Sequence, residues 1–168
     1  MPKRRGTNKE PLAKFSYRYA RPMLTADAVI LSKLDGKVKV LLIKRKNPPH
    51  QGSWALPGGY VNQNEPALDA AKRELAEETN LSGVKLTAIG FFDTPGRDPR
   101  GWTASVVHLG FARPSKLKLV RPGDDACGVT FLSLHTKVRL AFDHNQILRY
   151  AARWLKSNPL SGVGKATR

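Results

Sequence analysis

Three carboxylates on one edge of a predicted helix constrain this sequence more than any other feature. Apolar residues recur at helical spacing between residues 66 and 80, at Leu68, Ala71 and Leu75. This periodicity predicts a helix, with Pro66 tolerated in its first turn. At about 100° per residue, three glutamates of residues 73–78 fall within an arc of about 100°, beside the apolar face. These glutamates are Glu74, Glu77 and Glu78.

Helix stability alone does not favour this acidic cluster. Like charges three or four residues apart repel by roughly a few tenths of a kcal/mol per pair, and anions in the last turns oppose the helix dipole by about 0.3–1 kcal/mol each. A divalent cation would remove both penalties, and Mg²⁺ and Mn²⁺ prefer clustered carboxylate oxygens. Arg73, one turn before Glu77, can hold that carboxylate in place. The alternative is an acidic helix face exposed to solvent.

The residues around this helix carry a longer pattern. Gly59 is followed by five residues and Glu65, then by seven residues and the segment Arg73-Glu-Leu-Ala-Glu-Glu-Thr-Asn-Leu81. This arrangement resembles the Nudix box, Gly-x5-Glu-x7-Arg-Glu-U-x-Glu-Glu-x-Gly-U, in which U is aliphatic. Asn80 stands where the box has its second glycine. Because asparagine also tolerates the left-handed backbone of a helix C-cap, we expect the loop-helix-loop to be retained.

The resemblance to the Nudix family implies a fold and a reaction. The fold is an α/β (α+β) structure, an α/β/α sandwich around a mixed β-sheet. The reaction is the hydrolysis of a nucleoside diphosphate linked to another group, with divalent ions that neutralise the diphosphate and activate water. Glu65 and Arg73 would then support the motif. The residues that would bind the catalytic ions, Mg²⁺ or Mn²⁺, are Gly59, Glu74, Glu77 and Glu78.

Three segments outside the box resemble Nudix proteins that hydrolyse or sense ADP-ribose. They are residues 15–22, 94–101 and 141–144. In the second segment Arg97 and Arg100 can bind phosphates, and Asp98 can bind ribose hydroxyls. The alternative is a surface turn held by an Arg–Asp pair.

We therefore predict a metal-dependent pyrophosphohydrolase that converts ADP-ribose to AMP and ribose 5-phosphate. One alternative is a nucleotide-pool or dinucleoside-polyphosphate hydrolase of the same family. The other is a non-catalytic sensor of an ADP-ribose-like ligand that binds nucleic acid through the basic termini.

The resemblance to the Nudix family also implies a carboxylate in a later loop as a general base or further metal ligand, and here it would be an aspartate, because no glutamate follows Glu78. The candidates are Asp98, Asp124, Asp125 and Asp143. Residues 122–126, Pro-Gly-Asp-Asp-Ala, resemble a segment found at this place in many relatives, so Asp124 or Asp125 is the favoured catalytic residue. A turn or cap role for these two aspartates is the alternative.

Apolar runs bounded by glycine and proline predict the other elements. Strands are predicted at residues 25–32, 38–45, 54–56, 84–92, 103–112 and 129–132, and a second helix at 145–156. Asp35-Gly36 predicts a tight turn between the first two strands. Asp27 lies inside the first strand, where a carboxylate needs a partner. The predicted division is a basic extension (1–22), a Nudix domain (23–157) and a short basic tail (158–168).

The 168 residues include 29 Lys and Arg against 13 Asp and Glu, a formal net charge of +16, and residues 1–22 and 134–168 each contribute +6. Such termini can attract polyanions. Because no helix-turn-helix, zinc-ligand or RNP-like pattern is present, solvated tails are expected and nucleic-acid binding is the alternative. The single cysteine and the absence of an apolar run of about 20 residues predict a cytoplasmic protein that does not span a membrane. The expected partner is a nucleoside diphosphate derivative, and the resemblance also allows a homodimer.

Overall fold

The computed structural model of the protein describes residues 17–123 and 125–158. The strands are β1 (Met23–Leu34), β2 (Lys37–Arg45), β3 (Trp54–Ala55), β4 (Gly58–Tyr60), β5 (Leu86–Phe92), β6 (Thr103–Phe111) and β7 (Ala126–Ser133). The helices are α1 (Ala67–Thr79), α2 (His144–Ser157) and the 3-10 helix η1 (Pro114–Leu119). None of the described helices is long and apolar enough to cross a membrane.

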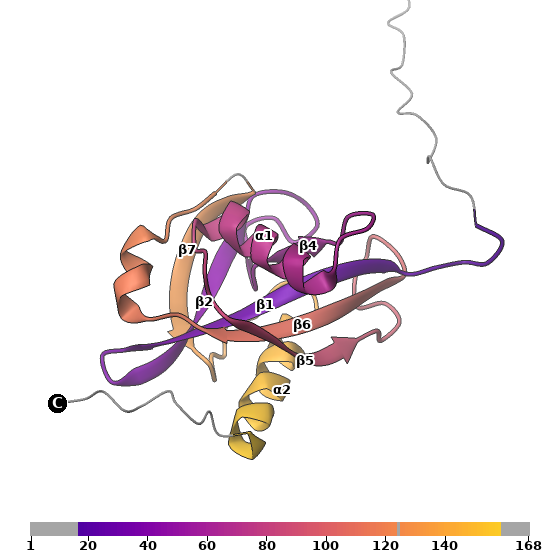
Figure 1. Cartoon of the computed structure of the whole chain (residues 1–168). Helices are drawn as coiled ribbons and strands as arrows, with labels where there is room; N and C mark the ends of the chain where they lie inside the picture. The colour runs from indigo at the N-terminus through magenta and orange to yellow at the C-terminus, as the bar shows by residue number, and fades with distance from the viewer. Residues whose placement is uncertain (1–16, 124, 159–168) are drawn as a thin grey trace, which may run out of the picture.

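Strand β1 is the centre of a mixed sheet. It pairs antiparallel with β2 and β4 and parallel with β6, while β3 and β7 both pair with β2, and β5 pairs with β6. Helix α1 covers one face of this sheet and α2 covers the other (Figure 1). The predicted α/β/α sandwich around a mixed sheet is therefore confirmed.

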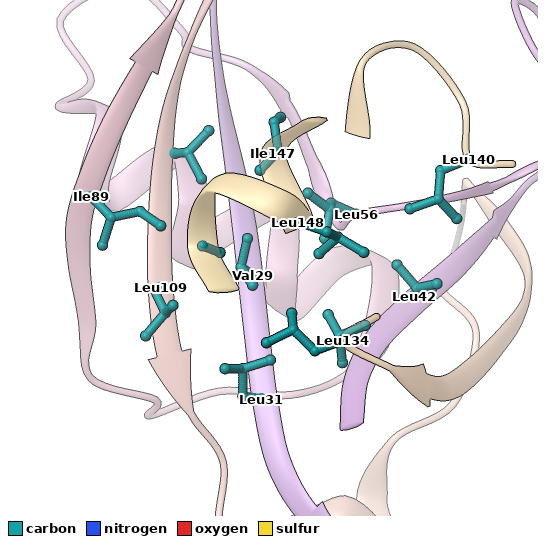
Figure 2. Close-up of a cluster of buried hydrophobic side chains, with 13 residues drawn as sticks. Val29, Leu31, Leu42, Leu56, Ile89, Leu109, Leu134, Leu140, Ile147 and Leu148 are labelled. Carbon is teal, nitrogen blue, oxygen red and sulfur yellow. The ribbon is translucent and has the colours of Figure 1, made fainter. Parts of the chain in front are cut away.

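The side chains on the two faces of β1 belong to two separate hydrophobic clusters. Successive side chains of a strand point to opposite faces, so Ala28 and Ile30 pack with α1, whereas Val29 and Leu31 pack with α2. Figure 2 shows the α2 cluster, in which Ile147 and Leu148 of the helix lie over Val29 and its neighbours. Each fully buried aliphatic side chain contributes roughly 1.5–3 kcal/mol by its removal from water. The β1 backbone is thus fixed from both sides, and it carries Asp27 to the site described below.

The predicted elements are present with shifted ends, and two short elements were not predicted. Strand β4 escaped prediction because Gly58 and Gly59 have low strand propensity, and its pairing with β1 is a long-range contact. Helix η1 was not predicted either. Leu68, assigned to the buried face of α1, is instead 36% exposed, and that face is formed by Ala70, Ala71 and Leu75.

The ends of the chain and the end of α1 complete the comparison with the sequence. Residues 1–16 of the predicted extension and 159–168 of the predicted tail lie outside the described residues. Asn80 caps α1 in the left-handed conformation, with φ +58°, as expected from its place in the box. Its amide donates to the carbonyl of Ala76 at 2.8 Å, so the substitution of glycine by asparagine leaves the helix end intact.

Candidate active site

The second half of α1 carries a hydrogen-bond network centred on Arg73. Its guanidinium donates to both carboxylate oxygens of Glu65, at 2.8 and 2.9 Å. It also donates to Glu74 at 2.7 Å, to Glu77 at 3.1 Å and to the carbonyl of Tyr60 at 3.0 Å. The planar fork of arginine suits such multiple ionic bonds. Arg73 therefore holds two of the three helix carboxylates and ties the chain before the helix to α1.

The third helix carboxylate, Glu78, is buried. It is 6% exposed and accepts a hydrogen bond from the Gly58 amide at 2.9 Å. Burial raises the pKa of Glu78 to about 8, and the negative charge of Glu74 adds to this rise. Burial raises the pKa of Glu74 as well. Two acids whose ionised form is disfavoured by their surroundings thus lie side by side.

The two glycines of β4 allow a close approach that no other residue would permit. A Cβ atom added to Gly59 would overlap the carboxylate of Glu74. A Cβ atom added to Gly58 would overlap the carboxylate of Asp27 and the carbonyl of Ala26. The β4 backbone therefore passes between Glu74 on one side and Asp27 on the other, in contact with both.

The carboxylates of α1 fit a divalent cation in their chemistry. Among residues 17–123 and 125–158, no three His, Cys, Asp or Glu side chains already converge as metal ligands, and Arg73 contacts Glu74 and Glu77. The donor set is nevertheless one of carboxylate oxygens, which Mg²⁺ and Mn²⁺ prefer. Because Gly59 has no Cβ atom, the carboxylate of Glu74 can lie directly against the backbone at this point.

A small cavity adjoins these carboxylates on the far side of β4. Its volume is about 50 Å³, and Gly58 and Gly59 form one wall. The charged and aromatic side chains that line it come from four separate parts of the chain. They include Asp27, Arg45, Arg97, Arg100, Phe142 and His144.

A buried ion pair forms part of the cavity wall. Arg97 donates from Nε and Nη2 to the two carboxylate oxygens of Asp143, at 2.9 and 2.8 Å, and these side chains are only 5% and 8% exposed. Nη2 of Arg97 also lies 3.8 Å from Asp27. Ser105 donates its hydroxyl to Asp27. Asp27 thus has the partners that its place within an apolar strand requires, and burial still raises its pKa.

The histidine at the start of α2 is fixed as a neutral ring. The amide of Leu56 donates to Nδ1 of His144 at 2.9 Å, so the ring proton is on Nε2, which lies 3.8 Å from Asp27. Burial lowers the pKa of His144 to about 3. The imidazole therefore carries no charge at neutral pH.

In the predicted substrate loop, residues 94–101, Arg97 bonds to a residue outside the loop, whereas Asp98 and Arg100 bond to each other. Arg97 is held by Asp143, as described above. Asp98, 4% exposed, accepts hydrogen bonds from the amide and the guanidinium of Arg100, at 2.6–3.1 Å. The Arg–Asp pair considered as the alternative for this loop is therefore present. All three residues nevertheless line the cavity.

Asp125, one of the two candidates for the predicted base, lies at the edge of the site. Asp124 is outside the described residues. Asp125 is exposed, accepts a hydrogen bond from the side chain of Asn47 at 3.1 Å, and does not line the cavity. Its carbonyl accepts from the amide of Lys46, which places this segment against the end of β2.

Several cavity residues were not among the predicted site residues, and they include Arg45 and Phe142, although Phe142 lies in the segment 141–144 that resembles ADP-ribose-related Nudix proteins. Arg45 lies at the half-buried end of β2, and burial together with the charge of Arg100 lowers its pKa. Phe142 precedes α2 and has a left-handed backbone, with φ +52°. A basic residue that ends a buried apolar strand was the one signal in the sequence that could have indicated Arg45.

Comparison with known proteins identifies the family. The NUDIX domain model matches residues 22–155. The chain belongs to the Nudix family. The match includes the box, which contains Gly59, Arg73 and the carboxylates of α1. The prediction of a Nudix hydrolase is confirmed by this match and by the relatives below.

The relatives of this Nudix protein include enzymes and a repressor. It is 39% identical to an ADP-ribose pyrophosphatase of Methanocaldococcus jannaschii, over 81% of this chain and 76% of that protein. It is 33% identical to the ADPR responsive transcriptional repressor NtrR of Acinetobacter baylyi, over 79% of this chain and 54% of that protein. The chain therefore spans about half the length of the repressor.

A solved structure shares the same fold. The NUDIX domain of Shewanella oneidensis NrtR, crystallised with ADP ribose, superposes with a TM-score of 0.75 at 28% identity. The match covers 88% of this chain and 94% of that domain.

Proposed function

We propose that this protein hydrolyses ADP-ribose to AMP and ribose 5-phosphate in a reaction that depends on Mg²⁺ or Mn²⁺. The observation that carries the proposal is the meeting of two charged groups at Gly58 and Gly59: the carboxylates of α1 on one side and the arginine-lined cavity on the other. The similarity to an ADP-ribose pyrophosphatase and to a domain crystallised with ADP ribose supports the choice of substrate.

The proposed roles follow from the positions of the side chains. Glu74, Glu77 and Glu78, with the carbonyl of Gly59, would hold the ions, while Arg73 orients the carboxylates through the contacts described above. A divalent ion held there would supply neutralisation of the diphosphate and activation of water. Arginines at the cavity would bind the phosphates by charge-assisted hydrogen bonds.

The identity of the base stays a prediction. Asp124 or Asp125 would accept a proton during the attack of water. The amide of Gly123 donates to the backbone carbonyl of Glu78 at 2.9 Å, so the segment that leads to the two aspartates packs against the end of α1. Separate substitutions of the two aspartates by asparagine, assayed for turnover, would show which one, if either, takes part.

The first experiment is a hydrolysis screen. ADP-ribose, NADH, diadenosine polyphosphates, nucleotide sugars and oxidised nucleoside triphosphates are incubated with the protein and Mg²⁺ or Mn²⁺, and products are resolved by chromatography. We expect AMP and ribose 5-phosphate from ADP-ribose to form fastest. A different preferred substrate would replace ADP-ribose in the proposal by a nucleotide-pool or dinucleoside-polyphosphate compound.

Substitution Glu78→Gln tests the role of the carboxylates. It should lower kcat by about 100-fold or more, since it removes a charge that acts on the transition state, while ADP-ribose binding stays measurable. Asp69→Asn is the matched control, because Asp69 lies on the same helix, is exposed and pairs with Lys72 at the surface. Equal loss of activity in both variants would mean that the substitutions act through the helix and not through the site.

A sensor function is the second candidate, and the similarity to NtrR favours it. In that case the protein would bind ADP-ribose without turnover, and ligand binding would change its affinity for DNA or RNA. Wild-type protein that binds ADP-ribose but hydrolyses no compound of the screen, and whose affinity for DNA or RNA changes with the ligand, would establish this alternative. A homodimer is also proposed, and sedimentation of the full chain tests it.

A further inference from the structure

Phe142 lies between two arginines of the cavity. The guanidinium carbon of Arg45 is 4.9 Å from the centre of the Phe142 ring, and that of Arg100 is 5.4 Å from it. Both distances are within the range of cation–π attraction. The guanidinium of Arg100 also lies over the Tyr60 ring, 4.8 Å from its centre. The Phe142 ring thus contacts two cations, one from strand β2 and one from the loop before β6, which are 55 positions apart in the sequence.

Both arginines keep hydrogen-bond donors beyond those that the fold uses. In the described part of the chain, Arg45 donates only from Nε, to the carbonyl of Pro49 at 2.8 Å. Arg100 donates from Nε and Nη2 to Asp98. Nη1 and Nη2 of Arg45 and Nη1 of Arg100 therefore remain for a ligand. Arg97 differs from both, because its Nε and Nη2 donors are both bound to the carboxylate of Asp143.

The arrangement around Phe142 is unfavourable for stability in two respects. Its backbone φ of +52° is one that residues other than glycine, asparagine and aspartate rarely adopt. The two guanidiniums also repel each other, since the charge of Arg100 contributes to the lowered pKa of Arg45. Such strain and repulsion are kept where a ligand is bound. An anion with more than one charged oxygen would satisfy both arginines together.

The two arginines also face the carboxylates of the proposed reaction. Arg45, Arg100 and Phe142 line the same cavity as Gly58 and Gly59, which contact Glu78 and Glu74. A diphosphate bound by the arginines would therefore lie next to the carboxylate helix.

We propose that Phe142 is a positioning residue that holds the guanidiniums of Arg45 and Arg100 together over its ring, so that both bind the diphosphate of the substrate. The choice of a diphosphate ligand rests on the proposed function. The contact itself requires no turnover, so it can be tested by binding alone.

The test measures the affinity of the full chain for ADP, AMP and adenosine by calorimetry in EDTA, which removes divalent ions. Phe142→Leu should weaken ADP binding by about fivefold to 30-fold, as expected for the loss of two cation–π contacts, and should leave adenosine binding unchanged. Phe142→Tyr keeps the ring and should retain ADP affinity. Phe91→Leu is the control, because Phe91 is an exposed aromatic residue on β5 that does not line the cavity.

A second variant guards against a failure to fold. Phe142→Asn also removes the ring, and asparagine tolerates the left-handed backbone. Phe142→Asn should weaken ADP binding as Phe142→Leu does. If either variant weakens adenosine as much as ADP, Phe142 acts on the base and not through the arginines, and the inference is wrong.

A double-mutant cycle separates positioning from direct contact. In the Arg45→Gln background, Phe142→Leu should have less effect on ADP affinity than it has in the wild type, because one of its two partners is gone. Full additivity would overturn the inference. Wild-type protein that hydrolyses ADP-ribose, with unchanged ADP affinity in Phe142→Leu, would refute only the role of Phe142. Absence of hydrolysis with the expected ADP series would refute only the proposed reaction.

Discussion

The neutral state of His144 has a consequence for stability that can be calculated. The folded protein binds a proton on this ring with a pKa of about 3, against the ordinary value of 6.5. Below pH 6.5 the unfolded chain takes up a proton that the folded chain does not, so stability falls as the pH falls from about 6.5 towards 3. Between pH 7 and pH 5, linkage assigns a loss of about 2 kcal/mol to this one group.

The substitution His144→Asn isolates this contribution. The side-chain oxygen of asparagine can accept the Leu56 amide in place of Nδ1, so the hydrogen bond at 2.9 Å is kept while the titrating group is removed. Unfolding by urea, followed by tryptophan fluorescence at pH 7, 6 and 5, gives the free energy of unfolding of each protein. The wild type should lose about 2 kcal/mol more than the variant between pH 7 and pH 5.

Other titrating groups are common to the two proteins and cancel in this difference. The raised pKa values of Asp27, Glu74 and Glu78 oppose the loss as pH falls, because these folded-state carboxyls bind protons more readily. His135→Asn, at an exposed position, is the control for replacing a histidine by asparagine away from this site. A stability difference between wild type and His144→Asn that stays constant from pH 7 to pH 5 would refute the buried neutral ring.

Two further substitutions test how the site is held. Arg97→Met leaves Asp143 and Asp27 without their cation and should lower the free energy of unfolding by about 3–5 kcal/mol, measured by chemical denaturation. Gly123→Ala would place a Cβ atom on the carbonyl of Glu77, so it should lower stability by about 1–3 kcal/mol or more in the same assay, and a neutral result would contradict the close packing of this segment against α1.

The local parts of the site could be predicted from the sequence, and the contacts across the fold could not. Helical periodicity and box spacing located the carboxylates to the residue, and the Asn80 cap followed from backbone preference. The partner of Arg97 is Asp143, 46 positions later, and nothing in the local pattern selects it over Asp98, its neighbour in the loop. The arginine that forms the buried ion pair with an aspartate is therefore determined by the packing of α2 against the strands.

Strand order had the same limitation. The parallel pairing of β1 with β6 brings Asp27 close to Ser105, and the two residues are 78 positions apart. Periodicity predicted both strands but not that they pair with each other, because parallel strands are joined by long connections. The partner that a carboxylate at Asp27 requires could be named only once Ser105 and Arg97 were seen beside it.

The separation of charge across β4 leads to a last prediction. In the described part of the chain no salt bridge joins Arg45 to Glu78, although the two groups influence each other, and the β4 glycines lie between the carboxylates and the cavity. A divalent ion would neutralise one group and a diphosphate the other, so each ligand should strengthen the binding of the other. Mg²⁺ should therefore raise the affinity for ADP more in the wild type than in Glu78→Gln, whereas both should bind ADP similarly in EDTA. The Mg²⁺–ADP complex formed in solution is the same for both proteins, so an equal gain in the two would show that the carboxylate helix and the arginines do not act on one ligand.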